Sequence, residues 1–390
     1  MSTIFPTNKL MYLNIVTDNK TPDSTYTIPR IKEWAIARGL KIPSGLNKDD
    51  MIQYLTGMIA EKSNGITRSV KNSVTPLNIL QARIPDVKLD WLIHLHIHGW
   101  AVVPIDGWNS AFTDEFLSWF ESCSPNFKKN DHNTWKGVNM PNMSRGILKH
   151  YFGHTELQWK IRELCAPIFA RIWGCRPEDL LCSYDGGCFL PSVPTDGIKN
   201  ASFKQWIHVD MPRDMRTFSC VQGIVNFEEN GPEDGGLVLV EGSHNIFGEY
   251  MDKHPSEGIT WGPSDMNDPL LGERPLIKIC APACSIILFD TRTFHCNVQP
   301  CGSRFRADGT ARFRMCTYVS MQPRSGAIAK ELMKRISLYE KGRMTGHWCY
   351  GPFFKETAEH PRTYGGINNK PEIIEIAHAN GFRRRLIGYE

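Results

Sequence analysis

The most constraining feature of the chain is a series of short apolar runs in its second half, each bounded by glycine, proline or a polar turn. Runs of this kind are typical of β-strands, and their close spacing favours a sandwich or a barrel. They lie at 180–191, 205–210, 218–227, 235–244, 276–290 and 311–321. The first half instead shows helical periodicity, at 111–122 and 154–174. The sequence therefore predicts an α+β fold in which helices buttress a β-barrel.

The composition is ordinary for a folded protein with a sizeable core. Of 390 residues, 41% are hydrophobic, and 45 basic residues against 41 acidic ones leave a formal charge of only +4, which announces neither a nucleic-acid nor a membrane partner. The N-terminus does not have the pattern of a signal peptide, and no apolar stretch is long enough to span a bilayer. The 12 cysteines are scattered through apolar segments, which suits reduced thiols. We expect an intracellular protein, cytoplasmic or nuclear and not secreted, without membrane association or disulfides.

Residues 26–62 carry two helical patterns joined by a turn that contains Pro43, Gly45 and Asn47. This segment resembles the SAP motif, a two-helix module that binds DNA or RNA in other proteins. The resemblance runs through Ile31, Gly39, Leu40, Gly45, Lys48 and Leu55. Two interpretations stay open, because the basic residues suit a nucleic-acid surface and suit equally a hairpin that packs on the main domain or on a protein partner. The Ser- and Asn-rich stretch that follows, within 63–85, is interpreted as a linker.

The main domain is expected to span residues 86–350 and to open with a helix that ends at Gly99, followed by a strand. His94, His96 and His98 would share one face only on a strand, so a helix argues against a metal role for them. Residues 351–390 are interpreted as a C-terminal extension with a basic tail, Arg383–Arg385. That tail suits a polyanion or, as readily, a solvated or partner-facing helix end.

A histidine and an aspartate stand one residue apart in the run 205–210. Because alternate side chains of a strand share a face, His208 and Asp210 are expected to project together and to hold one metal. A third ligand has to come from elsewhere, and His295 follows an apolar strand and a turn further along the chain. Two histidines and one carboxylate leave positions open on a non-haem Fe(II), as binding of a co-substrate and of oxygen requires.

Two arginines, Arg312 and Arg314, stand one apart in the run 311–321 among apolar and small residues. A guanidinium inside a barrel is costly unless it meets a carboxylate, and arginine is the residue best suited to clamp one. Either arginine is therefore a candidate anchor for the far carboxylate of a keto acid that chelates the iron.

The stretch between the ligands continues as a polar turn, a small-residue strand and a Gly-Ser-His turn, at Glu229–Gly231, Gly235–Val240 and Gly242–His244. With the ligand pattern, this resembles the phytanoyl-CoA dioxygenase family of Fe(II)- and 2-oxoglutarate-dependent oxygenases, and residues 89–105 resemble the family's first helix and strand. The resemblance implies a double-stranded β-helix, a jelly-roll or cupin-like barrel, over residues 86–350. It also implies Fe(II), 2-oxoglutarate and O2 as cofactor and co-substrates.

Carried over residue by residue, the resemblance implies His208, Asp210 and His295 as iron ligands. It implies Arg314 rather than Arg312 as the keto-acid anchor, because a small residue, Cys316, follows two positions later. Two features depart from the family pattern. The segment between His295 and the arginines is long, and Glu241 stands where a proline commonly precedes Gly-Ser-His.

The predicted activity is hydroxylation, or an oxidative demethylation that begins as hydroxylation. Halogenating relatives replace the carboxylate ligand with a small residue, and Asp210 is present here. The substrate stays open between a nucleic acid, a chromatin-like protein and a small molecule. The alternatives are a cupin-like metal protein that uses no keto acid, and a catalytically silent nucleic-acid-binding or structural protein built on the same barrel.

Other residues are weaker candidates. Gln205 and Trp206 are expected to line the cofactor pocket, and Lys204, Tyr184 and Asp185 are further candidates for its rim. The spacing of Cys280, Cys284, Cys296 and Cys301 is wider than that of a zinc knuckle, so these cysteines are interpreted as buried small apolar residues.

Overall fold

A computed structural model of the chain describes residues 90–141, 143–144, 146–148, 152–192, 207–255, 264–300, 304–357 and 376–390, the backbone of 81–83, and the single residues 32, 47 and 48. The SAP-like hairpin at 26–62 lies outside this range apart from those three single residues. So does most of the linker at 63–85. Both stay predictions.

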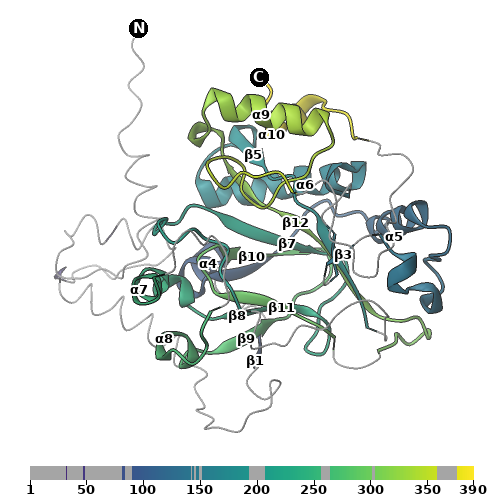
Figure 1. Cartoon of the computed structure of the whole chain (residues 1–390), viewed down its shortest axis with the longest axis horizontal. Helices are drawn as coiled ribbons and strands as arrows, with labels where there is room; N and C mark the ends of the chain where they lie inside the picture. The colour runs from purple at the N-terminus through teal and green to yellow at the C-terminus, as the bar shows by residue number, and fades with distance from the viewer. Residues whose placement is uncertain are drawn as a thin grey trace.

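Two sheets form the centre of the molecule (Figure 1). The larger has the order β2-β10-β7-β12-β6-β4-β3 and is antiparallel throughout, and the smaller has the order β1-β9-β8-β11, in which only β1 and β9 run parallel. The larger sheet contains β2 (Trp100–Pro104), β3 (Met143–Ser144), β4 (Ile147–Leu148), β6 (Gly187–Pro191), β7 (Val221–Asn226), β10 (Ser285–Asp290) and β12 (Phe313–Val319). The smaller contains β1 (Gln81–Arg83), β8 (Gly236–Val240), β9 (Leu276–Ile279) and β11 (His295–Val298). The fold is thus mixed α/β with mainly antiparallel sheets.

From β6 onward the chain passes back and forth between the two sheets. After β6 it reaches the edge of the smaller sheet, where His208 forms a bridge with His295 of β11. It then returns to the larger sheet for β7, forms β8 and β9 in the smaller, β10 in the larger, β11 in the smaller and β12 in the larger. Successive strands therefore wind around a shared interior that both sheets enclose.

The strands of the larger sheet bury both of their faces. On β10, Ile286 and Leu288 belong to one apolar core and Ile287 and Phe289 to another, as the two-residue repeat of a strand requires. The first core is shared with the helices, and the second is shared with Leu237, Leu239, Ile277 and Ile279 of the smaller sheet. This explains why β10 is apolar at consecutive positions rather than at alternate ones.

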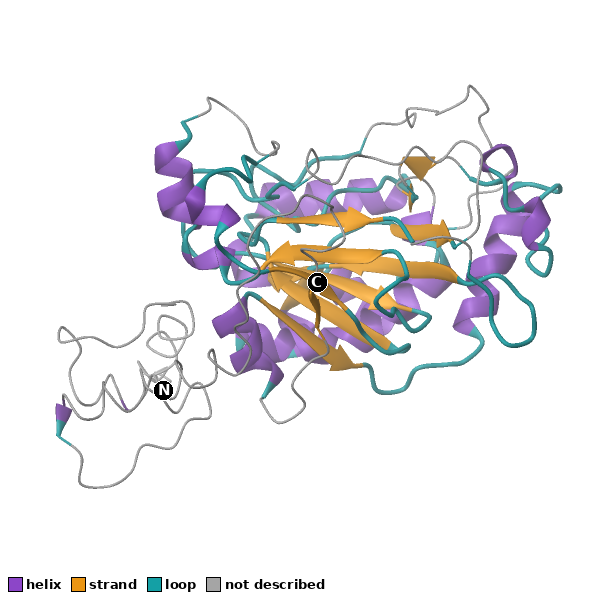
Figure 2. Ribbon diagram, turned by 90° about the horizontal axis from the view of Figure 1, so that it is seen from below, coloured by secondary structure: helices purple, strands orange, loops and turns teal. Residues whose placement is uncertain are grey.

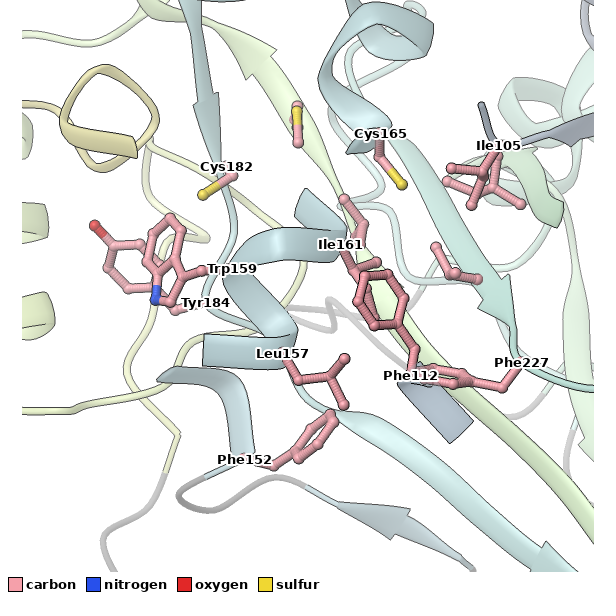
Figure 3. Packing of buried hydrophobic residues seen from close by; sticks show 14 of the residues in the cluster. Ile105, Phe112, Phe152, Leu157, Trp159, Ile161, Cys165, Cys182, Tyr184 and Phe227 are labelled. Carbon is pink, nitrogen blue, oxygen red and sulfur yellow. The ribbon is translucent and has the colours of Figure 1, made fainter. Parts of the chain in front are cut away.

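Several helices share a core with the outer side of the larger sheet. Seen from the side of the smaller sheet, they stand behind the strands (Figure 2). Helix α5 (Phe112–Cys123) and helix α6 (Glu156–Trp173) confirm the two helices expected from periodicity. Around α6, Phe152, Leu157 and Ile161 pack in a largely aromatic core (Figure 3). Thr155 caps α6 by accepting the Gln158 N–H, and Gly174 ends it in the left-handed conformation.

Helix α4 (Trp91–His98) ends at Gly99, as the sequence predicts, with φ of 83°. A Cβ on Gly99 would lie 2.5 Å from His244 Nδ1 and 2.8 Å from Thr293 Oγ1, so only glycine fits this turn. The histidines of α4 have structural contacts. His94 Nδ1, for instance, lies 2.7 Å from the Trp100 carbonyl oxygen.

The segment 205–210 was expected to be a strand, and this is only partly right. Of its described residues, 207–210, only His208 makes a ladder contact, the single bridge to His295. Pro212 follows closely and offers no backbone N–H, which stops the ladder from extending. The bridge nevertheless places His208 beside β11.

Four further helices and a short two-stranded sheet complete the described fold. The helices are α7 (Phe247–Lys253), α8 (Pro269–Gly272), α9 (Ala329–Glu340) and α10 (Gly381–Ile387), and the small sheet pairs β5 (Leu180–Cys182) with β13 (Met321–Pro323). None of the helices in the described part of the chain combines the length and apolarity that a bilayer crossing demands. Cys280, Cys284 and Cys296 are free thiols, and Cys301 lies outside the described residues.

The chain end packs into the core rather than extending from it as a basic tail. Leu386 and Ile387 of α10 are buried, and Arg383 forms ion pairs with Glu156 and Glu163. Arg383 is only 4% exposed, so it is not available to bind a polyanion. Arg384 and Arg385 remain exposed.

Arg335 on α9 joins several of these segments. Its buried guanidinium donates to the carbonyl oxygens of Cys182 (2.6 Å), Cys349 (2.6 Å), Leu386 (3.0 Å) and Ile387 (2.9 Å). It therefore ties β5, the segment before 350 and α10 together.

We expect Arg335→Met to lower the free energy of unfolding by about 3 kcal/mol or more, because four buried carbonyl oxygens lose their donor while the apolar volume is kept. Urea denaturation of the two proteins measures the difference. Arg385→Met on the exposed face of α10 is the matched control, and we expect a change within about 0.5 kcal/mol. Equal losses in both variants would contradict the role assigned to Arg335.

Candidate metal centre

The structure brings the three sequence-predicted ligands together. One potential ligand atom from each of His208, Asp210 and His295 lies within 4.8 Å of the others. His208 Nε2 lies 3.6 Å from Asp210 Oδ1, and His295 Nε2 lies 3.5 Å from Asp210 Oδ2. Both histidines are buried. The carboxylate thus stands between two imidazoles whose Nε2 atoms point toward it.

The backbone fixes the two histidines relative to each other. His208 N donates to His295 O at 2.9 Å, and His295 N donates to His208 O at 2.8 Å. This reciprocal pair holds the ring centroids 4.4 Å apart. The spacing of the two imidazoles is therefore set by main-chain geometry and does not depend on side-chain packing alone.

Two side-chain interactions hold the turn that precedes His295. Asp290 and Arg292 form a buried bidentate pair, with Nη2 to Oδ2 at 2.6 Å and Nε to Oδ1 at 3.0 Å. Burial alone would raise the pKa of Asp290, but the Arg292 guanidinium holds it below its ordinary value. Ser243 Oγ accepts the Phe294 N–H at 2.9 Å. The Gly-Ser-His segment is thus a turn, as expected, and it anchors the residue next to a ligand.

Hydrogen bonds from neighbouring groups orient the His295 imidazole and the Asp210 carboxylate toward the position of a bound cation. His295 Nδ1 lies 2.9 Å from the Thr293 carbonyl oxygen, which can only accept, so Nδ1 carries a proton and Nε2 is the nitrogen available to a metal. Gln222 Nε2 donates to Asp210 Oδ2 at 3.2 Å and orients the carboxylate. Both contacts are of the outer-shell kind that orients metal ligands in proteins.

Asp210 is ionised in this setting. Burial raises its pKa, yet the hydrogen bond with His295 and the nearby His208 and His295 imidazoles outweigh burial and hold the pKa well below its ordinary value. An ionised carboxylate flanked by two imidazole nitrogens is a ligand set for a divalent metal with open coordination positions. The residues present therefore fit a ferrous ion.

The ligands line a cavity of about 340 Å³ between the two sheets. Ile224, Leu237 and Phe289 form apolar wall, and Arg314 supplies a cation. Arg314 is 4% exposed, and its Nη1 donates to Asn297 Oδ1 at 2.6 Å and contacts Cys188 Sγ at 3.5 Å. Its Nε has no hydrogen-bond partner among the described residues. A buried guanidinium with unused donors suits an anionic ligand.

The two candidate arginines have different surroundings. Arg312 Nη2 donates to Asp234 Oδ2 at 2.8 Å and Nε to Oδ1 at 3.2 Å, so its fork is occupied by a carboxylate of the protein. Arg312 is not among the residues that line the cavity, whereas Arg314 is. The two-residue repeat of a strand would place both arginines on one face, so it does not explain the difference. Arg312 precedes β12 and Arg314 lies within it.

Of the other candidates, Gln205, Trp206 and Lys204 lie outside the described residues, so their placement stays a prediction. Tyr184 is buried in the helical core and its hydroxyl contacts the Ile387 carbonyl oxygen at 3.1 Å, so it does not line the cavity. Asp185 does line it.

Among the polar cavity residues that sequence reasoning missed are Gln222, Asn297 and His347. Asn297 had a usable signal, because it stands two positions after His295 on one strand and so shares its face. Gln222 and His347 had none, since tertiary packing alone brings β7 and the segment before 350 to the metal ligands.

The two departures from the family pattern leave the cavity intact. Glu241 Oε1 accepts from Trp100 Nε1 at 3.3 Å and lies 3.2 Å from His98 Nδ1, which ties β8 to the end of α4. The long segment after β11 turns back on itself, with a bridge between Phe305 and Ala311. Neither Phe305 nor Ala311 lines the cavity.

Comparisons with known proteins give distant similarities. No family model matches the chain. A protein of Aspergillus versicolor named Ava biosynthesis cluster protein O is 33% identical over 144 residues, which cover 36% of this chain and 44% of that protein. The chain thus matches less than half the length of this relative.

Among solved structures, the epimerase SnoN in complex with Fe3+, alpha ketoglutarate and nogalamycin RO aligns at 12% identity and a TM-score of 0.37, over 58% of this chain and 79% of SnoN. HygX from Streptomyces hygroscopicus with nickel and 2-oxoglutarate bound aligns at 15% identity and a TM-score of 0.37, over 60% of this chain and 86% of HygX. At TM-scores below 0.5, neither alignment bears on the activity of this chain.

We expect the protein to bind one Mn(II) per chain, and His208→Ala and His295→Ala to weaken that binding at least about a hundredfold, because each removes one of three ligands. Isothermal titration calorimetry under anaerobic conditions measures the affinity. His378→Ala, which removes an exposed histidine, is the control. Binding that survives both ligand variants would place the metal elsewhere.

Gln222→Ala tests the support of Asp210. We expect Mn(II) affinity to fall about tenfold, since the carboxylate loses the donor that orients it while all three ligands remain. Gln222→Met should lose about as much, because it keeps the length of the side chain and removes the donor to Asp210 Oδ2. An unchanged affinity in both variants would show that Gln222 does not support the ligand.

Proposed function

We propose that the chain is an Fe(II)- and 2-oxoglutarate-dependent oxygenase that hydroxylates, or by hydroxylation demethylates, a C–H bond of a small molecule. The observation that carries the proposal is the joint presence, in one cavity, of the His208–Asp210–His295 cluster and the buried Arg314. A metal site alone suits a cupin-like protein as well. A buried arginine in the same cavity, beyond the ligands, is what a dicarboxylic co-substrate needs.

The fold supports the proposal. The alternation of strands between two sheets, from β6 through the bridge at His208 to β12, agrees with the winding of a double-stranded β-helix. In this arrangement the first metal ligands come from one edge segment and the third from its hydrogen-bonded neighbour. We propose that residues 86–350 form this barrel and that α10 belongs with it.

The position of Arg314 matches the length of the co-substrate. Asn297, its hydrogen-bond partner, follows His295 by two residues on β11, a distance of about 6–7 Å along a strand. An extended five-carbon keto acid that chelates a metal beside His295 spans that distance and presents its far carboxylate to the guanidinium. Asn297 then positions Arg314, and Cys188 packs against it.

The overall reaction balances as follows. The substrate R–H, 2-oxoglutarate and O2 give R–OH, succinate and CO2, so that one oxygen atom enters succinate and the other enters the hydroxyl group. The keto acid and the C–H bond are each oxidised by two electrons, and O2 accepts all four. A ferrous ion held by the three ligands supplies the redox chemistry that activates dioxygen.

The protein's own residues have defined tasks in this proposal. His208, Asp210 and His295 hold the metal from one side and leave the other open. Gln222 keeps the Asp210 carboxylate in place. The apolar side chains of Phe289 and Leu237 keep water from the reacting centre. Retention of Asp210 as a ligand leaves no ligand position for chloride, which favours hydroxylation over halogenation.

The size of the cavity supports a small-molecule substrate. Its volume of about 340 Å³ is at the lower end of the range for small-molecule sites. The name of the similar A. versicolor protein refers to a biosynthesis cluster, which also agrees with a small molecule. Nucleic-acid binding rests on the SAP-like hairpin at 26–62, and no described residue of the barrel adds to it.

Anaerobic titration with Fe(II) and 2-oxoglutarate tests the proposal. We expect the visible charge-transfer band of the iron–keto acid chelate, and we expect Arg314→Ala to require about 10–100-fold more keto acid, because one charge-assisted carboxylate clamp is lost. Arg312→Ala is the matched control, since its guanidinium binds Asp234 outside the cavity.

The outcomes separate the alternatives. Iron binding without a band would identify a cupin-like metal site that uses no keto acid. No iron binding would favour a structural protein. A band that is weakened by Arg312→Ala but not by Arg314→Ala would reassign the anchor.

A further inference from the structure

Asp185 stands out among the cavity residues because no part of the proposed chemistry uses it. It is 7% exposed and lines the cavity. Its Oδ1 accepts the Gly186 N–H at 2.8 Å, and among the described residues no cationic side chain pairs with the carboxylate. The buried Arg162 guanidinium acts on this carboxylate through its charge without pairing with the carboxylate oxygens, so the oxygens stay available to a partner that binds in the cavity.

The location of Asp185 separates it from the keto-acid anchor. β6 and β12 pair with Leu190 opposite Arg314 and Gly187 opposite Thr317, so the chain before Gly187 runs toward Tyr318 and Ser320. The Tyr318 N–H donates to the Gly186 carbonyl oxygen at 2.8 Å, which fixes Asp185 at that end. Tyr318 lies four residues from Arg314 on β12, a separation of roughly 13 Å along the strand. Asp185 is thus at the end of the cavity that the keto acid does not need.

The carboxylate is held rigidly. Arg162, fully buried behind it, donates through Nη2 to the backbone oxygen of Asp185 at 3.1 Å and through Nη1 to that of Gly153 at 2.6 Å. These bonds fix the main chain and leave the carboxylate of Asp185 unclamped. A rigid acceptor at a cavity wall is the arrangement used to orient a bound molecule.

Formal charges indicate what that molecule carries. With the proposed contents, Fe(II) (+2), Asp210 (−1), 2-oxoglutarate (−2) and Arg314 (+1) sum to zero. At the other end Asp185 presents a negative charge to the cavity, while Arg162, the buried cation that acts on it, lies behind it and does not line the cavity. His347 and Ser320 line the same end, and each offers polar hydrogen-bonding groups.

We propose that Asp185 is the substrate-recognition residue and that the substrate bears a protonated nitrogen, such as an ammonium or guanidinium group, which binds this carboxylate. The inference rests on the proposed function for the keto acid at the Arg314 end. The acidic end of the cavity then selects a cationic small molecule and sets which C–H bond faces the metal.

The test compares a cation with its neutral counterpart. Benzylamine and benzyl alcohol are titrated into the full-length protein carrying Mn(II) and 2-oxoglutarate, and relaxation of the probe protons by Mn(II) reports binding near the metal. We expect benzylamine to bind about tenfold more tightly or better than benzyl alcohol. Asp185→Asn should abolish the preference, since Asn keeps the acceptor for Gly186 N–H and loses the charge. Glu178→Gln, which removes an exposed charge, should keep it.

Equal affinity for the two probes, no binding of benzylamine, or a preference that survives in Asp185→Asn would overturn the proposal. Thermal unfolding checks that the variant folds, and Asp185→Ser replaces it if it does not. Calorimetry with the metal-free protein measures the affinity for both probes without iron or keto acid, so it tests the cation site separately from the proposed oxygenase function. If the protein prefers benzylamine through Asp185 but forms no iron–keto acid band, the oxygenase proposal is wrong and the cation site stands. If the band forms normally but neither probe is preferred, only the cation site is wrong.

Discussion

The site depends on one main-chain contact, the reciprocal hydrogen bonds between His208 and His295. These bonds join segments far apart in the sequence and set the spacing of two imidazoles before any metal binds. The carboxylate of Asp210 then lies between them. Without a cation, this buried carboxylate is stabilised by the neighbouring imidazoles and by the Gln222 amide, so the fold is arranged for a ligand that it does not itself supply.

Several neighbouring interactions hold His295 in position for its hydrogen bonds with His208. The buried Asp290–Arg292 pair, the Ser243–Phe294 hydrogen bond and the close approach of Gly99 to Thr293 hold the turn that leads into His295. Farther out, the helices cover one face of the larger sheet, so the other face is free to enclose the cavity with the smaller sheet. Stability and function thus use opposite faces of the same strands.

The two ends of the cavity differ in charge, and the strands determine which residues lie at each end. β12 carries Arg314 at one end and Tyr318 at the other, and the metal ligands contribute from β11 and its neighbouring segment. A molecule bound at the Arg314 end and one bound at the Asp185 end therefore meet near the metal. The cavity thus presents a guanidinium at one end and a carboxylate at the other.

The sequence by itself determined the elements and the ligand types. Apolar runs bounded by turn residues gave the strands, the helical periodicity gave α5 and α6, and the glycine after His98 gave the end of α4, because these signals are local. Strand parity linked His208 to Asp210, the position of His295 after an apolar strand made it the candidate third ligand, and the family resemblance favoured Arg314. Only the tertiary structure decided that Arg312 binds Asp234 while Arg314 lines the cavity, and that Asp185, Gln222 and His347 converge there. Those contacts join separate strands and segments, and their geometry is fixed by packing between sheets, which no local pattern records.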